Sequence, residues 1–173
     1  DFIDVIQIPA YLCMQTELTT KAAEKGKSIN LKKGQFLSPN DVEKIVLKIK
    51  STGNNNITIT ERGTCFGYRD LMVDPRSFLI LKKLNYPVFF DVGHSVRKNG
   101  FPSSNIKDGG QKEFGETYAR SAISNFVDGL FIEVHPDPKN AKCDAATQFS
   151  FSEFENLMNN VKPLWDFVNS DKT

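Results

Sequence analysis

Short apolar segments alternate five times with longer segments of helical periodicity along this chain of 173 residues. The short segments are rich in β-branched and aromatic residues, as strands are, and they are residues 5–8, 28–32, 54–60, 88–94 and 129–135. Helices are predicted at residues 15–25, from 38, from 74, at 111–126 and from 152. Strict alternation of this kind predicts an α/β fold with an all-parallel sheet and helices outside it.

Two architectures satisfy this alternation, an open doubly wound sheet and part of a (β/α)8 barrel. The strands are apolar throughout, which is expected when both faces of a parallel sheet are buried. The chain has no GxGxxG or P-loop signature, which disfavours a dinucleotide or nucleoside triphosphate fold. A barrel typically needs about 250 residues, so five units would form an incomplete one. We expect one domain over residues 1–173.

The last predicted helix carries two local signals. Ser152 with Glu155 fits a capping box at its start. Pro163 is expected to end or kink the helix, because proline cannot donate its backbone hydrogen bond.

Charge and composition exclude several kinds of partner. The formal net charge is +1, with 39% apolar and 25% charged residues, so neither a nucleic-acid tract nor a membrane surface is indicated. No apolar run approaches the roughly 20 residues of a membrane span, and no signal peptide is visible. Three cysteines without short spacing indicate reduced thiols. These features predict a cytoplasmic protein that binds neither nucleic acid nor membranes.

Charged and polar residues follow the carboxyl end of every predicted strand. Such ends point the same way in a parallel sheet, so these side chains are expected to converge. Converging Lys and Arg indicate an anionic ligand, since the Arg fork suits phosphate oxygens and Lys supplies a point charge. The alternative is that the cations are paired with Glu61 or Asp91. The residues are Gln7, Lys32 with Lys33, Glu61 with Arg62, Asp91 with His94, and Glu133 with His135.

A second set of candidates is His94, Glu133 and Asp144. An imidazole with two carboxylates suits a divalent ion of the Mn, Fe or Zn type. The long spacing leaves open the alternative that His94 is a hydrogen-bonded structural residue. Cys143 could also be a ligand, although a bystander thiol is the commoner case.

Seven motifs occur in one order along the chain: DVIQIPA at 4–10, LCMQTEL at 12–18, NLKKGQF at 30–36, TERGT at 60–64, FGY at 66–68, DVGHSV at 91–96 and EVHPD at 133–137. With these motifs the whole chain, essentially without gaps, closely resembles the 3-deoxy-D-manno-octulosonate 8-phosphate (Kdo-8-phosphate) synthases. The 3-deoxy-D-arabino-heptulosonate 7-phosphate (DAHP) synthases share the chemistry but only fragments of these motifs.

The resemblance implies a (β/α)8 TIM barrel, a homotetramer, of which this chain would hold the fourth to eighth units. It implies a transferase that condenses phosphoenolpyruvate with D-arabinose 5-phosphate and water, releasing phosphate, for lipopolysaccharide synthesis. Three kinds of site follow from it. Gln7, Ala10, Lys32 and Arg62 would bind substrate; Lys32, Arg62 and His94 would be catalytic; and His94, Glu133 and Asp144 would hold a divalent metal.

Motifs such as CDAATQ at 143–148 resemble the metal-dependent class of these enzymes, whose fourth ligand, a cysteine, has no counterpart here. The first three units of the barrel are absent, with part of the expected substrate contacts. Three residues depart locally from the family pattern: Met14 replaces an Arg, and Gly93 and Arg97 replace the more frequent Thr and Gln. Two alternatives remain, a catalytically incomplete fragment and a DAHP or sialic-acid-type synthase of the same superfamily.

Overall fold

The computed structural model describes residues 2–68, 70–98 and 109–170. The polar, glycine-rich composition of residues 97–110 predicts a loop, and most of that segment lies outside the described residues. Five strands form one sheet in the order β1-β2-β3-β4-β5, and every neighbouring pair is parallel. The predicted α/β fold with a parallel sheet is therefore confirmed. The strands are β1 (Val5–Ile8), β2 (Ser28–Lys32), β3 (Ile57–Glu61), β4 (Val88–Asp91) and β5 (Gly129–Phe131).

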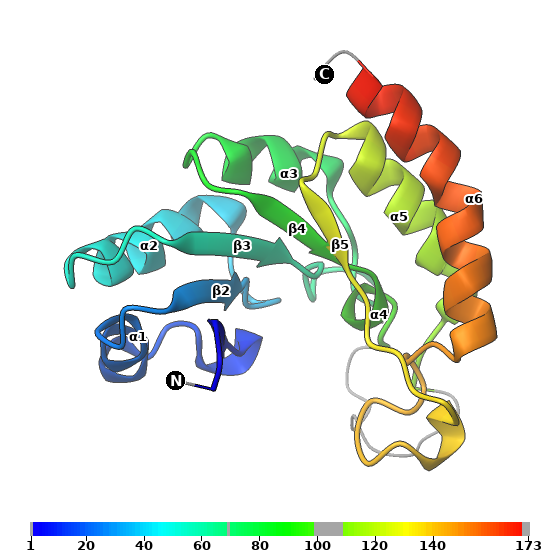
Figure 1. The fold of residues 1–173 in the computed structure, drawn as a ribbon, viewed down its shortest axis with the longest axis horizontal. Coiled ribbons are helices and arrows are strands. Elements are labelled where there is room, and N and C mark those ends of the chain that lie inside the picture. Colours follow the sequence, from blue (N-terminus) through cyan, green and yellow to red (C-terminus); the bar gives the residue numbers. More distant parts are fainter. Residues whose placement is uncertain (1, 69, 99–108, 171–173) are drawn as a thin grey trace.

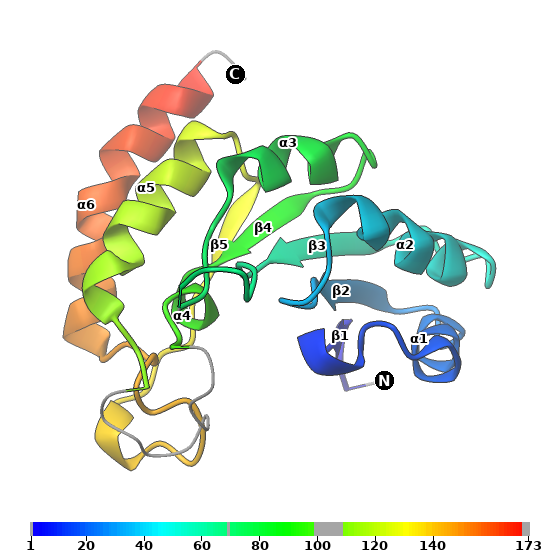
Figure 2. The ribbon, with the colours of Figure 1, turned by 180° about the vertical axis from the view of Figure 1, so that it is seen from behind.

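Helices connect successive strands and lie in chain order along the convex side of the curved sheet (Figures 1 and 2). The strand order contains no reversal, whereas a doubly wound sheet has one. This arrangement favours a partial barrel over the doubly wound alternative. The α-helices are α1 (Thr16–Ala23), α2 (Val42–Lys50), α3 (Pro75–Lys82), α4 (Val92–Ser95), α5 (Gly115–Ser124) and α6 (Phe151–Asn169). Short 3-10 helices are η1 (Ala10–Leu12), η2 (Pro39–Asp41), η3 (Lys112–Phe114) and η4 (Pro138–Asn140).

The two faces of the sheet differ in polarity. Residues at alternate strand positions, such as Ile29 and Ile59, are fully buried in the apolar core under the helices. On the other face Asn30 donates a hydrogen bond to Gln7, at 3.3 Å, and accepts one from Thr60, at 2.6 Å. The expectation that the strands are apolar on both faces is therefore wrong. The second face carries polar side chains, and these lead toward the strand ends.

Helix α6 differs from its prediction at two points. It begins after Ser150, whose hydroxyl accepts a hydrogen bond from the Glu153 backbone while the Glu153 carboxylate accepts one from the Ser150 backbone. The capping box predicted at Ser152 is thus displaced by two residues. The helix also continues through Pro163, because Leu164, Trp165 and Val168 beyond it pack against the core. None of the described helices is long and apolar enough to cross a bilayer.

Replacing Ser150 with alanine is expected to lower the free energy of unfolding by about 1 kcal/mol, because one backbone donor of the first turn loses its acceptor. Ser152→Ala is the matched control, since among the described residues the Ser152 hydroxyl has a hydrogen-bond contact with the Ser150 hydroxyl alone, at 3.2 Å. Urea unfolding of the two variants measures the difference. Equal losses in both variants would contradict the assignment of Ser150 as the cap.

Candidate active site

A pocket of about 200 Å³ lies at the carboxyl ends of the first four strands. The prediction that strand-end side chains converge is confirmed for five of them, which reach the pocket from β1, β2 and β4, from the residue after β3, and from helix α4. Since half of the lining residues are charged, the pocket suits a small polar ligand. Its lining residues are Gln7, Pro9, Ala10, Tyr11, Lys32, Arg62, Asp91, His94, Arg97 and Asp144.

Two of the lining side chains are buried cations, Lys32 with 3% and Arg62 with 2% of the residue surface exposed. Lys32 pairs with Asp91, and its Nζ lies 3.1 Å from the centroid of the Phe131 ring. Arg62 donates a hydrogen bond to the Gln35 side chain. Burial lowers the pKa of both groups, and the negative charge of Asp91 opposes that shift. Cations already stripped of water interact strongly with an anion, so this pocket is suited to bind one.

Asp91 joins these cations to His94. It is fully buried, and its Oδ2 contacts both the Lys32 ammonium and His94 Nδ1, the latter at 2.9 Å. Its Oδ1 accepts the His94 backbone N–H at 2.9 Å, which starts helix α4. Burial acts to raise the pKa of Asp91, but the hydrogen bonds and charges of His94 and Lys32 outweigh it and lower the pKa to about 2. Asp91 is therefore an ionised carboxylate shared by two functional side chains.

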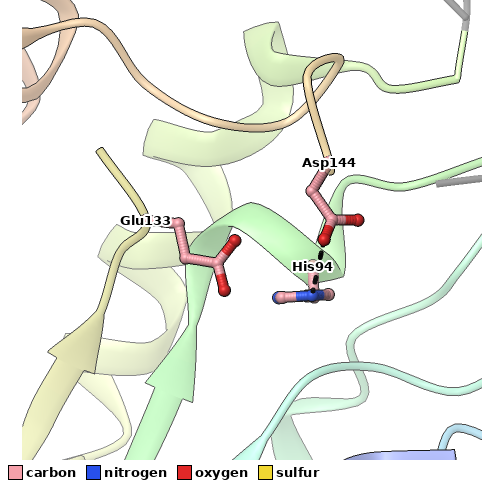
Figure 3. Close-up of side chains that lie close together, drawn as sticks. All are labelled: His94, Glu133 and Asp144. Atoms are coloured by element: carbon pink, nitrogen blue, oxygen red, sulfur yellow. Dashed lines mark ion pairs between the residues drawn. The ribbon is translucent and has the colours of Figure 1, made fainter. Parts of the chain in front are cut away.

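His94, Glu133 and Asp144 form a compact group, in which one ligand atom from each lies within 4.8 Å of the others. Figure 3 shows the two carboxylates approaching the His94 ring from different sides. Nε2 of His94 lies 3.8 Å from Oδ2 of Asp144. The three residues come from helix α4, the segment after β5 and the loop before α6. The sequence-based grouping of these three residues therefore corresponds to a real cluster in space.

Backbone hydrogen bonds hold the two carboxylates in place. The Glu133 carbonyl accepts the Phe149 N–H at 3.0 Å, and the Phe149 carbonyl accepts the His135 N–H at 2.8 Å. Asp144 has a φ of +50°, and its carbonyl accepts N–H groups from Thr147, at 2.9 Å, and Gln148, at 3.0 Å. The loop before α6 thus folds back on the segment after β5, bringing residues far apart in sequence together.

The donor set fits a divalent metal. Asp91 binds Nδ1 of His94 and leaves Nε2 facing the group, as is usual for metal-ligating histidines. Oδ1 of Asp144 is buried and has no hydrogen-bond partner among the described residues. Burial raises the pKa of Glu133, so its charged form gains from a neighbouring cation. One imidazole with two carboxylates suits Mn, Fe or Zn.

Lys33 and Glu61 do not reach the pocket, so the prediction for these two residues is wrong. Successive side chains of a strand point to opposite faces, and Lys32 takes the face with the pocket. Lys33 is fully buried, 3.3 Å from Glu61, and donates to three backbone carbonyls. Glu61 accepts the backbone N–H groups of Arg62, at 2.9 Å, and Gly63, at 2.7 Å. The pair therefore shapes the loop that carries Arg62.

His135 also lies away from the group. Its Nδ1 accepts the Asp137 N–H at 3.0 Å, which assigns it to a turn. Asp91 was expected at this strand end and as a possible partner of the cations, and its pairing with Lys32 confirms that alternative. Its contact with the His94 ring was not predicted. Tyr11 was also missed, and no pattern in the sequence identifies it.

The three local departures from the family pattern differ in their surroundings. Met14 is 39% exposed and does not line the pocket. Gly93 is buried, and a Cβ atom there would approach the Thr147 carbonyl to 3.2 Å, so a larger residue needs a small shift of the neighbouring turn. Arg97 lines the pocket.

A parallel β/α sheet with a cationic pocket and a His–Glu–Asp group at its strand ends defines a barrel-type protein with its ligand site on that face. Comparison with known proteins gives the family. Residues 1–167 match the DAHP synthetase I family, and the chain belongs to it.

Curated relatives carry one shared name. A 2-dehydro-3-deoxyphosphooctonate aldolase of Geotalea uraniireducens (strain Rf4) is 47% identical over 164 residues, covering 95% of this chain and 60% of the relative. The protein of the same name from Geobacter sp. (strain M21) is 47% identical over 169 residues, covering 98% of this chain and 61% of the relative. A third, from Desulfotalea psychrophila (strain LSv54 / DSM 12343), is 43% identical and covers 91% of this chain and 56% of the relative. The chain thus spans about 60% of the length of these relatives.

Proposed function

We propose that this chain is part of a Kdo-8-phosphate synthase, which condenses phosphoenolpyruvate with D-arabinose 5-phosphate in lipopolysaccharide biosynthesis. The observation that carries the proposal is the position of a buried cationic pocket next to the His94, Glu133 and Asp144 group, with Asp91 contacting both. The shared name of the relatives, which denotes the same enzyme, supports it. In this proposal the five strands correspond to the fourth to eighth of the barrel.

The phosphoenolpyruvate site is assigned to Lys32 and Arg62. Both cations are desolvated before the ligand arrives, which strengthens their attraction for a phosphate, although Lys32 shares its charge with Asp91. Gln7 and Ala10 border the same pocket. Gln7 is held by Asn30, which leaves the carboxamide facing the polar side of the sheet.

The metal site is assigned to His94, Glu133 and Asp144, and a bound divalent ion would supply Lewis acidity and orient the reactants. Asp91 holds the His94 ring through Nδ1 at 2.9 Å, so Nε2 stays directed at the group. The same carboxylate oxygen, Oδ2, also pairs with the Lys32 ammonium. His94 is therefore presented in one orientation, without the cost of ordering a free side chain.

The reaction balances without a redox partner. A carbon–carbon bond forms between C3 of phosphoenolpyruvate and the aldehyde carbon of the pentose, and the aldehyde oxygen gains a proton. Water adds at C2, and the bond from C2 to the phosphate oxygen breaks, leaving a ketone and inorganic phosphate. Lys32 and Arg62 would hold the phosphate from binding until it leaves, stabilising its growing negative charge.

Several features of the proposal depend on the whole protein. A homotetramer and a cytoplasmic location remain predictions. The alternative to an active synthase is a catalytically incomplete fragment. One observation favours it, because the chain spans about 60% of its relatives' length.

Two measurements on the purified chain test the function. Calorimetry is expected to detect phosphoenolpyruvate binding, and absence of binding would contradict the proposal. Phosphate release is then measured with D-arabinose 5-phosphate, erythrose 4-phosphate and N-acetylmannosamine. Turnover with D-arabinose 5-phosphate but with neither of the other two aldehydes would support Kdo-8-phosphate synthase. Turnover with another aldehyde would assign a different synthase of the superfamily. Binding without turnover would support the incomplete fragment.

A further inference from the structure

Arg97 lies beside the Asp144 carboxylate of the proposed metal group. Its side chain is 12% exposed and lines the pocket, and its Nη1 lies 3.6 Å from Oδ1 of Asp144. The other carboxylate oxygen of Asp144, Oδ2, lies 3.8 Å from Nε2 of His94. The two oxygens of one carboxylate thus face different neighbours, a fixed cation and the nitrogen offered to a metal.

The charges around the group indicate how Arg97 affects the binding of a divalent ion. Asp91 is paired with Lys32, so its charge is already compensated. Glu133 and Asp144 are then the carboxylates left to balance a divalent ion. Arg97 takes up part of the charge of Asp144. We propose that Arg97 competes with the divalent ion for Asp144 and thereby lowers the metal affinity of this chain.

This inference rests on the proposed metal site. An opposing effect is that a cation beside a ligand carboxylate also orients it, and losing such a partner usually weakens metal binding. Here orientation is the smaller effect, because the separation of 3.6 Å is longer than a hydrogen bond. The backbone of Asp144 is moreover already fixed by Thr147 and Gln148. Repulsion between a guanidinium and a divalent ion, in contrast, acts across the whole group.

Titration of Mn²⁺ alone into the 173-residue chain tests the proposal. Arg97→Gln is expected to bind Mn²⁺ about tenfold more tightly than the wild type, since one nearby positive charge is removed. Arg97→Lys, which keeps the charge, should bind as the wild type does. The gain in Arg97→Gln should shrink as salt is raised, because screening weakens the repulsion it removes. A purely structural role would not give this salt dependence.

Two controls separate the possible failures. Lys162→Gln removes the same charge from an exposed ion pair with Asp166 on α6, and its affinity should not change. His94→Ala should abolish Mn²⁺ binding. Unchanged or weaker binding in Arg97→Gln, with binding still dependent on His94, would overturn the role of Arg97 and leave the proposed function intact. Wild-type binding that does not depend on His94 would overturn the proposed metal site together with this inference.

Discussion

Replacing Arg62 with alanine is expected to weaken phosphoenolpyruvate binding by about 30-fold or more, because truncating one partner of a buried charge pair costs about 2 kcal/mol at least. The guanidinium is 2% exposed and belongs to the pocket wall, so water cannot replace it in full. Calorimetric titration of the purified variant measures the change. The affinity of Arg62→Lys for phosphoenolpyruvate should lie between those of the wild type and Arg62→Ala, since lysine keeps the charge and loses the planar fork.

Arg76→Ala is the matched control for this experiment. Arg76 is an arginine of helix α3 whose side chain is 85% exposed and paired with Asp74, far from any pocket residue in sequence. Its loss should leave the affinity for phosphoenolpyruvate unchanged. Equal affinity in Arg62→Ala and the wild type would remove Arg62 from the binding site and contradict the proposed function.

Replacing Asp91 with alanine is expected to lower the free energy of unfolding by about 3–5 kcal/mol, because it leaves the Lys32 ammonium buried without a partner. The substitution also removes the acceptor that starts helix α4. Urea unfolding followed by circular dichroism measures the loss. Asp166→Ala, which breaks an exposed pair with Lys162, should cost less than about 1 kcal/mol.

A loss of this size could leave little folded protein, so a second variant keeps the prediction testable. The double variant Asp91→Asn with Lys32→Met removes both buried charges, and it should recover most of the stability lost in Asp91→Ala. A double variant as unstable as Asp91→Ala would show that the carboxylate stabilises the fold through something other than its charge.

Local signals predicted the elements well where a few residues decide the backbone. Ser38 and Asp74 each accept the backbone hydrogen bond expected of a helix cap. At α6, Ser150 and Ser152 both precede a glutamate by three residues, so sequence alone allows two starting points. In the structure Ser150 and Glu153 form the capping box, so the helix begins at the earlier of the two. Pro163 was misleading because packing outweighs one missing hydrogen bond.

The site was predictable only in part, for a geometric reason. Alternation along a strand assigns neighbouring residues to opposite faces, so Lys32 and Lys33 cannot both face the pocket, yet either assignment fits the sequence. His94 and Asp144 are brought together by a turn in which Asp144 takes a positive φ. No periodic pattern encodes that contact; the residue types suggested the grouping, and the resemblance to a family supported it. The full role of Asp91 could not be predicted, because it depends on which partner each carboxylate oxygen contacts: Oδ2 pairs with Lys32, and Oδ1 accepts the His94 backbone N–H.

The Asp91 carboxylate contacts both Lys32 in the cationic pocket and His94 in the proposed metal group, so binding at one of these places should affect binding at the other. An anion that draws the Lys32 ammonium toward itself leaves more of the Asp91 charge on His94 Nδ1, which makes Nε2 a stronger donor to a cation. The factor by which the anion changes cation affinity must then equal the factor by which the cation changes anion affinity. In the proposed function, this one buried aspartate would therefore couple the anion site to the metal site.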